Sequence, residues 1–434
     1  MKFIRWAAAS FVFFLLVGCV EGTSEQVTSG GPRFDPPSDP GGPAVSFQDR
    51  WEMPESARPN DATISLYEDR RREWRRLITG AGDIFVIRPA GNAVPFRRAP
   101  NPESAALSGQ LREGYLLSYL YYDNGVIRYD GLAADGRFSR NLNNDTLFFT
   151  HSSGKSITSY IVGHAICEGD ISSIDEAIDW PMMQNTLYQG QPLRNLLNMS
   201  AGDRHVMNRA SNRVMGSATH HRDMGLDTAA SLLSGTERRG NDIFYNNFLT
   251  DVVAGYTAFS VGSDYPDLVR RVFRNKIGIE DEVSMSLHHR TTTNGQRSPY
   301  FGQFQSRATY SYLISRTDFM RVGVAMMRDY QANTCVGQYL RQVQAQAVRC
   351  DFCTNRGGDR WMWLATHARR YGAKFYFDFD GMRGRNIMGT EGLNGQNLLI
   401  DLDNSRIVAT HSAANGWDVQ SLMVDVIRSG TLPD

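Results

Sequence analysis

Ser152 and Lys155 stand three residues apart in the segment 149–158 (FTHSSGKSIT), where a polar stretch turns into an apolar, helix-like pattern that ends at Gly169. On a helix, this spacing brings the two Cβ atoms to within roughly 5–6 Å of each other. A serine hydroxyl becomes an effective nucleophile when a neighbouring base takes its proton. The first turn of a helix also supplies N–H groups that stabilise developing negative charge. The pair therefore predicts acyl transfer, with Ser152 as nucleophile and Lys155 as base.

A second segment carries a phenol and an amide at the start of another apolar helix. Tyr245 and Asn247 form a Tyr-x-Asn pattern directly before Phe248, where apolar residues begin to recur at helical spacing. A phenol in this position can relay a proton between a nucleophile, its base and the leaving group. We therefore expect Tyr245 to be catalytic and Asn247 to help position the substrate.

A third segment is rich in glycine and precedes a predicted β-hairpin. Residues 389–396 read GTEGLNGQ, and the hairpin that follows has Asp403-Asn404 as its turn. Glycines let the backbone approach a substrate closely. We expect the N–H groups of Ser152 and Leu393 to hold the oxyanion of the reaction, with Gly392 beside them.

The three segments occur in the order found in a known family. From about residue 116 to its C-terminus, the chain resembles the serine β-lactamase-related hydrolases of the class C and penicillin-binding-protein type. It is most similar to the branch of aminohexanoate-dimer (nylon-oligomer) hydrolases and esterases. Three further stretches support the resemblance: residues 164–175 (HAICEGDISSID), residues 193–202 (LRNLLNMSAG), which are like the family's Leu-Leu-x-Met-x-Ser-Gly, and residues 315–323 (SRTDFMRVG).

The resemblance implies a role for each matched residue. Ser152 accepts the acyl group, Lys155 is its base and Tyr245 is the catalytic tyrosine. Asn247 is the amide companion of that tyrosine, and Gly392-Leu393 forms the oxyanion strand. A conventional Ser-His-Asp site is not indicated, because the chain has no Gly-x-Ser-x-Gly motif. A catalytically silent envelope protein that binds peptidoglycan or a partner is the alternative outside the enzymes, but it would have no chemical need of the whole set.

The order of the predicted elements indicates an α+β fold. Strands expected at Tyr115–Tyr122 and Val126–Asp130 precede the helix of Ser152, and terminal strands with a final helix at Trp417–Arg428 follow a long, mostly helical stretch. Early and late strands that join one sheet are typical of α+β proteins. The resemblance likewise implies an antiparallel sheet flanked by helices, an all-helical lobe, and a site between them.

Thr390 departs from the family pattern and bears on the substrate. Lactamases and peptidases of the family usually carry Lys or His at this position, where the cation holds a substrate carboxylate; here Glu391 follows the threonine. Loss of a charged hydrogen bond costs about 1.5–3 kcal/mol. We therefore expect small ester or amide substrates, with a β-lactamase or D,D-peptidase as the alternative. His151 and Thr390 are candidate substrate-binding residues, and Arg383 or Arg385 could replace the missing cation.

The N-terminus resembles a bacterial lipoprotein signal. Lys2 and Arg5 precede an apolar run that ends in Leu16-Val-Gly-Cys19. A run of about a dozen apolar residues is shorter than the roughly 20 that cross a bilayer. We expect Cys19 to become the lipidated first residue of the mature chain. Val20 after it favours the outer membrane, facing the periplasm.

This interpretation divides the chain into a signal peptide (1–18), a lipidated tether (19–60) and a hydrolase domain (61–434). The tether is rich in Pro and Gly and has too few apolar residues to form a core. The chain has 46 basic and 46 acidic residues, so it lacks the charge excess of a nucleic-acid-binding protein. The expected partners are a small-molecule substrate and, through Cys19, the membrane.

Four cysteines remain besides Cys19, and the expected export of the protein permits a disulfide among them. We expect Cys335 to pair with Cys350 or Cys353, and Cys167 to be a buried thiol. The Cys-x-x-Cys of residues 350–353 lacks a second Cys/His pair at zinc-finger spacing. We therefore expect neither a metal nor another cofactor.

Overall fold

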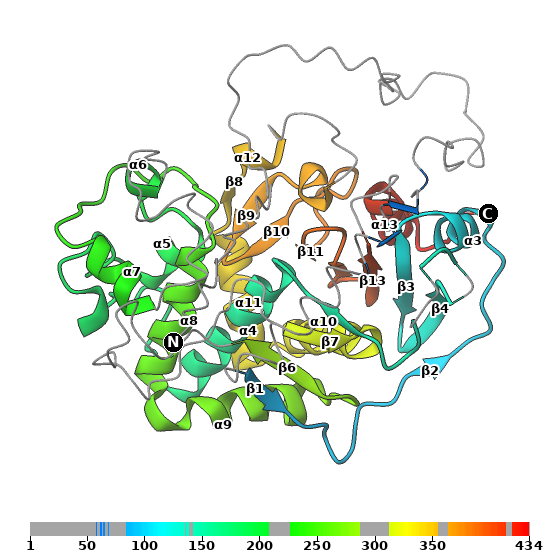
Figure 1. The fold of residues 1–434 in the computed structure, drawn as a ribbon, viewed down its shortest axis with the longest axis horizontal. Coiled ribbons are helices and arrows are strands. Elements are labelled where there is room, and N and C mark those ends of the chain that lie inside the picture. The colour runs from blue at the N-terminus through cyan, green and yellow to red at the C-terminus, as the bar shows by residue number, and fades with distance from the viewer. Residues whose placement is uncertain are drawn as a thin grey trace, which may run out of the picture. The chain divides into compact units, whose positions relative to one another are not determined.

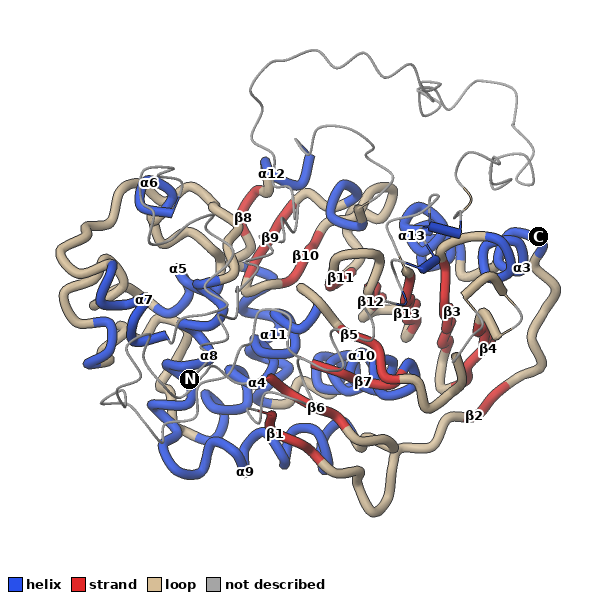
Figure 2. The backbone as a smooth tube through the Cα atoms, viewed as in Figure 1, coloured by secondary structure: helices blue, strands red, loops and turns tan. Residues whose placement is uncertain are grey.

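The chain folds around a large β-sheet that joins strands from both ends of the sequence (Figures 1 and 2). This computed structural model describes residues 58, 61–62, 64–65, 68, 84–134, 136–138, 142–207, 226–286, 312–354, 363–413 and 419–433. The described residues all belong to one unit, Ser46–Asp434. None of their helices is long and apolar enough to cross a membrane. Cys19 and residues 1–57 as a whole lie outside the described residues.

The large sheet has nine strands and is mixed. In spatial order they are β2 (Arg97–Arg98), β4 (Val126–Leu132), β3 (Leu116–Asp123), β13 (Arg406–Ser412), β12 (Asn397–Asp401), β11 (Ile387–Thr390), β10 (Phe375–Phe377), β9 (Arg370–Gly372) and β8 (Val348–Arg349). Neighbouring strands are antiparallel except β2 and β4, which are parallel, so the predicted antiparallel sheet is present with one parallel pair at its edge. Tyr121 lies opposite Val408, which confirms that early and late strands share the sheet.

Two hairpin turns set the register around the middle of this sheet. Asn124 and Gly125 join β3 to β4 with φ angles of 48° and 88°. Both residues therefore lie in the left-handed region that a two-residue type I′ turn requires, and an Asn-Gly pair is the sequence best suited to it. The predicted hairpin between β12 and β13 is confirmed, and Asp401 lies opposite Arg406 at its end.

Helices cover both faces of the sheet. On one face, α10 (Arg316–Gln331) packs so closely that a Cβ on Gly323 would lie 3.2 Å from Ile407. The other face is covered by α3 (Ala105–Glu113) and α13 (Val419–Ser429), where the Thr410 hydroxyl contacts the Met423 sulfur. Successive side chains of a strand point to opposite faces of the sheet. Ile407 and Thr410 are three positions apart on β13, so their side chains lie on opposite faces.

The helix of Ser152 is α4 (Ser153–Glu168), and it is buried along nearly its whole length. It lies between α8 (Phe248–Val261) and α11 (Cys335–Ala345) (Figure 1). A Cβ on Gly163 would come within 2.6 Å of the Tyr339 ring, and the Tyr339 hydroxyl shares a hydrogen bond of 2.7 Å with Ser159. The small residues of α4 therefore permit close helix packing. A helix that is apolar or small on all sides is expected to be buried.

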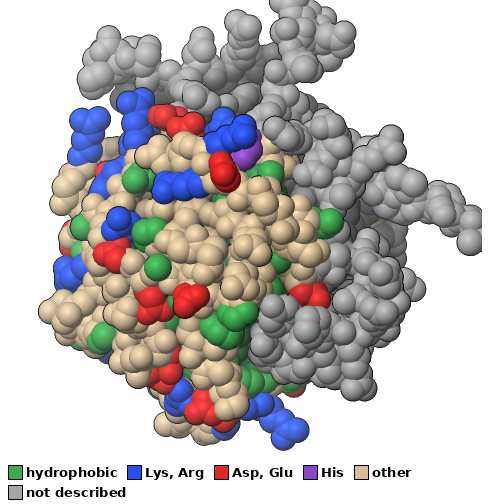
Figure 3. Space-filling view, turned by 90° about the vertical axis from the view of Figure 1, so that its left-hand side faces the viewer, with side chains coloured by type: hydrophobic (Ala, Val, Ile, Leu, Met, Phe, Trp, Pro, Cys, Tyr) green, Lys and Arg blue, Asp and Glu red, His purple; other side chains and the backbone are tan. Residues whose placement is uncertain are grey.

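The predicted helical lobe is formed by short helices beside α8. They are η2 (Pro181–Met183), α5 (Leu193–Leu197), α6 (Arg204–Met207), α7 (Leu226–Leu232), η3 (Gly262–Asp264), α9 (Tyr265–Arg270) and the π-helical η4 (Arg271–Ile277). Two further short helices are α12 (Asp351–Thr354), which follows the edge strand β8, and η6 (Leu364–His367), which packs against α12 and α13. On the face drawn in Figure 3, basic and acidic side chains are interspersed and hydrophobic side chains form small separate patches.

A second sheet was not predicted from the sequence. It is antiparallel and has the order β1 (Ile84–Ile87), β6 (Val283–Ser286), β7 (Tyr312–Ser315) and β5 (Leu147–Phe149). Its strands have three or four residues, too few for a clear alternating pattern. Strand β5 leads directly into the turn before Ser152, and the Thr150 N–H donates to the Tyr312 carbonyl at 2.9 Å. This small sheet therefore positions the nucleophile.

The disulfides differ from the predicted pairing. Cys167 at the end of α4 is bonded to Cys335 at the start of α11, and Cys350 is bonded to Cys353. The expectation of a free Cys167 thiol was wrong because α4 and α11 pack side by side, a contact between residues 168 positions apart that spacing alone does not reveal.

Candidate active site

Ser152 and Lys155 are in contact, as their spacing predicted. The Lys155 Nζ lies 2.8 Å from the Ser152 Oγ. The Lys155 side chain is buried, with 1% of its surface exposed, whereas Ser152 is only half-buried at the start of α4. The pair therefore combines an amine largely shielded from water with the hydroxyl of a residue that is only half-buried.

The turn before α4 holds Ser152 at the helix start. His151 has a φ of 47°, in the left-handed region where histidine is tolerated better than most non-glycine residues. Its ring packs edge-on against Phe149 at 5.1 Å, and the side chain is 9% exposed. The Gly154 N–H donates to the His151 carbonyl at 3.0 Å, which begins the helix. His151 is therefore part of the turn that directly precedes Ser152, and its role in substrate binding stays a prediction.

Two backbone N–H groups beside the nucleophile are available for a ligand. Within the part of the chain that the structure describes, neither the Ser152 N–H nor the Leu393 N–H donates to a protein acceptor. The Gly392 N–H, in contrast, donates to the Asn397 side chain at 3.2 Å. Free N–H groups at a helix start and in a neighbouring loop are the donors that an oxyanion hole needs.

The glycine-rich segment reaches this place as a loop rather than as a strand. Strand β11 ends at Thr390, and residues 391–396 turn back toward β12. A Cβ on Gly392 would lie 2.3 Å from the Thr150 carbonyl, so glycine is required where this loop passes the nucleophile turn. The Ser153 hydroxyl donates to the Gln396 carbonyl. The loop is therefore fastened to α4 directly beside Ser152.

Thr390 and its neighbours face the protein interior. The Thr390 hydroxyl donates to the Ser153 Oγ at 3.0 Å and accepts from the Leu398 N–H at 3.2 Å. Glu391 is also buried and accepts from the Ala365 N–H. Arg385, a candidate replacement for the missing cation, forms an ion pair with Asp401 and donates to carbonyls at the end of α13. Arg385 therefore has a structural role away from Ser152.

Tyr245 and Asn247 lie directly before α8, as predicted. The Lys155 Nζ is 5.1 Å from the centre of the Tyr245 ring, which brings the phenol ring beside the serine–lysine pair. Asn247 is the half-buried residue that precedes the helix. The cap itself is provided by Asn246, whose side-chain oxygen accepts from the Leu249 N–H at 3.0 Å.

A buried polar group behind Tyr245 was missed from the sequence. The Asp203 carboxylate accepts from the Asn246 side chain at 3.0 Å and from the Tyr188 hydroxyl at 2.9 Å. Burial raises the pKa of Asp203 to about 6, while these hydrogen bonds act to lower it. Asp203 therefore supports the Tyr245–Asn247 segment through Asn246. In the sequence, the only indication of a role for Asp203 was its position directly after residues 200–202 (SAG), which match the family pattern.

Lys374 was also missed. It lies in the turn between β9 and β10 with a φ of 72°, is 2% exposed, and donates from its Nζ to the Leu196 carbonyl at 2.8 Å. Burial, and next the charge of Lys155, lowers the pKa of Lys374 well below its usual range, whereas Asp203 and Asp251 act in the opposite direction. No motif marks this lysine, because it reaches the site from another element.

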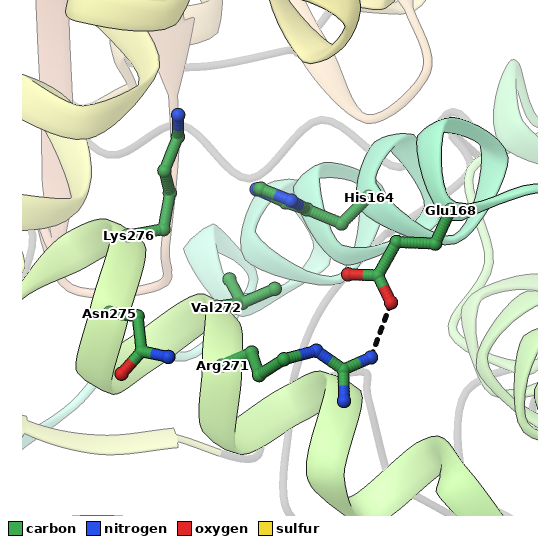
Figure 4. Close-up of a pocket in the computed structure, with 6 residues that line it drawn as sticks. All are labelled: His164, Glu168, Arg271, Val272, Asn275 and Lys276. Atoms are coloured by element: carbon green, nitrogen blue, oxygen red, sulfur yellow. Dashed lines mark hydrogen bonds and ion pairs between the residues drawn. The ribbon is translucent and has the colours of Figure 1, made fainter.

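A separate cavity of about 240 Å³ lies on another part of α4 (Figure 4). Its charged residues pair with neighbours: Arg271 with Glu168, and Lys276 with Asp329 at 2.6 Å. His164 also lines it. None of the predicted site residues lines this cavity, and its ion pairs indicate a structural role.

Comparison with known proteins identifies the fold. No protein-family model matches the chain, and no curated protein matches it in sequence. Among solved structures, a candidate 6-aminohexanoate-dimer hydrolase from Bacillus anthracis is similar, with a TM-score of 0.56 and 13% identity over 87% of this chain and 100% of that one.

Two further structures are similar at a TM-score of 0.50. EstCE1, a hydrolase with promiscuous acyltransferase activity, has 13% identity over 72% of this chain and 93% of its own. A class C β-lactamase has 11% identity over 72% of this chain and 91% of its own. The structural similarity establishes the fold, and the low sequence identities leave the substrate open. The chain therefore has the α+β fold of the serine β-lactamase-related hydrolases, as its ordered motifs predicted.

Proposed function

We propose that this protein is a serine hydrolase that cleaves ester or amide bonds of small substrates through an acyl-enzyme on Ser152. The observation that carries the proposal is the 2.8 Å contact between the Lys155 Nζ and the Ser152 Oγ, beside two N–H groups that donate to no acceptor among the described residues. A nucleophile, its base and an oxyanion site in one place are the parts that acyl transfer requires. The fold shared with solved hydrolases supports the proposal.

In the proposed reaction, Lys155 accepts the Ser152 proton as the Oγ attacks the substrate carbonyl. The Ser152 and Leu393 N–H groups hold the oxyanion of the tetrahedral intermediate, and Gly392 lets their loop approach. Tyr245 donates its hydroxyl proton to the leaving group and takes the Ser152 proton from Lys155 in return, and Asn247 positions the substrate. Water then attacks the acyl-enzyme, with the same groups moving the proton in the reverse direction, and the acid product leaves with Ser152 restored.

The surroundings of Thr390 favour uncharged substrates. Thr390 carries no charge, and its hydroxyl donates to Ser153. Arg385 is paired with Asp401, so it does not replace the missing cation for a substrate carboxylate. The hydrolase from Bacillus anthracis and EstCE1 have names that point to amide and acyl-transfer chemistry. We therefore favour esters or amides over β-lactams. The second candidate, a β-lactamase or D,D-peptidase, is supported by the similar class C β-lactamase.

Hydrolysis rates distinguish these substrates. Wild type is expected to hydrolyse a neutral short-chain ester with a kcat/KM at least roughly tenfold above that for nitrocefin, or for an ester with a carboxylate near the scissile bond. The reason is that Thr390 cannot form the charged hydrogen bond that would bind the substrate carboxylate. Ser152→Ala and Lys155→Met should each abolish hydrolysis of the neutral ester. Equal rates on nitrocefin and the neutral ester would favour the β-lactamase alternative.

We also propose that the mature protein is anchored to the bacterial cell envelope through a lipid on Cys19, facing the periplasm. The lipoprotein-like sequence that ends at Cys19 carries this proposal. Two disulfides, Cys167–Cys335 and Cys350–Cys353, support an oxidising compartment.

A further inference from the structure

Gln396 ends the glycine-rich loop of residues 391–396 and is buried, with 4% of its surface exposed. Leu393 and Asn394, in contrast, are only half-buried in the middle of the same loop. A backbone N–H in a partly exposed loop serves as an oxyanion donor only when the loop holds it in a fixed place. The contacts that Gln396 makes therefore bear on the Leu393 N–H.

The side-chain amide of Gln396 forms hydrogen bonds through both of its ends. Its Nε2 donates to the Asn394 carbonyl at 3.0 Å and to the Ser412 carbonyl at 2.7 Å. These two acceptors fix the NH₂ group on their side, so the Oε1 faces the His411 Nδ1 at 2.8 Å. Because an amide oxygen only accepts, the His411 Nδ1–H is the donor. Gln396 thus ties the loop to two consecutive residues of β13.

Two aromatic rings hold His411 in place. Its ring stacks on Phe148 of β5, with ring centres 4.2 Å apart and planes at 10°, and its centre lies 5.0 Å from that of Phe319 on α10. Burial, and next the charge of Arg316, lowers the pKa of His411 to about 3, so the ring is neutral at neutral pH. Because β5 leads into the turn before Ser152, the ring that binds Gln396 also packs on the strand that positions the nucleophile.

The backbone of Gln396 is attached beside the nucleophile. Its carbonyl accepts from the Ser153 hydroxyl, and its N–H donates to the Gly392 carbonyl at 3.2 Å. Ser153 directly follows the nucleophile, and Gly392 directly precedes Leu393. One residue therefore connects the two backbone segments that carry the proposed oxyanion donors.

We infer that Gln396 positions the glycine-rich loop, so that the Leu393 N–H lies where the carbonyl oxygen of the substrate becomes negative. Gln396 is a positioning residue, because it acts through the loop rather than on the substrate. The inference rests on the proposed function and adds the residue that fixes one of the two oxyanion donors. Donors that are fixed before the reaction stabilise an oxyanion without reorganising as it forms.

The test compares labelling by a fluorophosphonate with labelling by its thiono analogue, in which sulfur replaces the phosphoryl oxygen. Sulfur is a weak hydrogen-bond acceptor, so the oxyanion donors contribute less to the reaction of the thiono analogue. Loss of one oxyanion donor slows catalysis by about 10²–10³-fold, and a donor that is displaced rather than lost should cost less. Gln396→Met should therefore slow labelling by the fluorophosphonate roughly tenfold and labelling by the thiono analogue by less than about twofold.

The matched control is Gln191→Met, in the helical lobe between η2 and α5. Gln191 is also buried, and its amide has an equivalent set of partners. Its Nε2 donates to the Leu187 and Ala201 carbonyls at 2.7 and 3.0 Å, and its Oε1 accepts from the Asn195 side chain at 3.0 Å. This variant should keep the wild-type ratio of the two labelling rates, even where it lowers stability.

The ratio of the two rates separates positioning from a general loss of structure, because unfolding lowers both rates equally. An unchanged ratio in folded Gln396→Met would overturn the inference, while labelling of wild type and not of Ser152→Ala would still support the proposed function. If Gln396→Met does not fold, His411→Phe keeps the ring stack and removes the Nδ1–H. Its ratio should fall in the same direction, and an unchanged ratio would overturn the inference. An unlabelled wild type would refute the proposed function and the inference together.

Discussion

His164 lies on α4 with its ring edge-on to Tyr160, and burial lowers its pKa to about 4. Within the described part of the chain, its Nε2 has no hydrogen-bond partner. Because the folded pKa lies below the unfolded value of about 6.5, His164 stabilises the protein fully above pH 6.5 and loses this contribution as the pH falls through about 4. The buried, neutral ring is therefore a source of acid sensitivity.

We predict that His164→Gln reduces the loss of stability between about pH 6.5 and 4 by about 1–2 kcal/mol. Asp203 acts in the opposite direction: its raised pKa favours the fold below about pH 4 and this contribution is lost as the pH rises through about 6. The difference in stability between wild type and the variant isolates the contribution of His164, because both proteins carry Asp203. Urea unfolding at several pH values measures the difference. Parallel pH profiles for the two proteins would contradict the assignment.

Residues on one helical turn were predictable, whereas residues that meet through the fold were not. Ser152 and Lys155 lie on one turn, so their contact follows from local spacing. Lys374 and Asp203 carry no local pattern, and their relation to Lys155 depends on how α4, α5 and the β9–β10 turn pack. Buried charges of this kind become visible only when the elements around them are in place.

Among the elements, helices α4 and α11 are joined both by close packing and by a disulfide. Tyr339 fits over Gly163, and Cys167–Cys335 joins the two helices. This bond closes a long loop of the unfolded chain, whereas Cys350–Cys353 spans a sequence separation of only 3. In the chain-entropy account, a disulfide stabilises more when it closes a longer loop.

We predict that Cys167→Ser/Cys335→Ser lowers the free energy of unfolding by roughly 2–5 kcal/mol. The matched control, Cys350→Ser/Cys353→Ser, should lower it by less, about 1–2 kcal/mol. Denaturant unfolding without a reductant compares the two double variants with wild type. A larger loss in the control would show that loop length does not decide the effect here.

Long elements were predicted well and short ones poorly. The strands before α4, the helix α8 and the hairpin β12–β13 have enough residues to show their periodicity. The four-stranded second sheet was missed because its strands are short and its partners are far apart in the sequence. Residues 391–396, after Thr390, were predicted to form a strand, but they form a loop. The prediction interpreted their glycines as allowing close approach to a substrate and did not consider a turn.

For the whole molecule, the proposed location in the cell envelope depends on lipid modification of Cys19. We predict that the mature chain starts at a lipid-modified Cys19 and sediments with membranes, because acyl chains on this residue would insert their hydrocarbon into the bilayer. Cys19→Ser should appear in the soluble fraction or remain unprocessed. Mass analysis of the N-terminal peptide measures the modification. An unmodified Cys19, or a Cys19→Ser chain in the same membrane fraction with a processed N-terminus, would remove the lipoprotein proposal.

The central claim is that Ser152 is the nucleophile, and intact-mass analysis after exposure to a fluorophosphonate tests it most directly. Wild type should gain the mass of one phosphonyl group per chain, and Ser152→Ala should gain none. Ser172→Ala, which removes an exposed serine just beyond α4, is the matched control and should be labelled like wild type. A Ser152→Ala chain that still gains one phosphonyl group would place the nucleophile elsewhere and contradict the account.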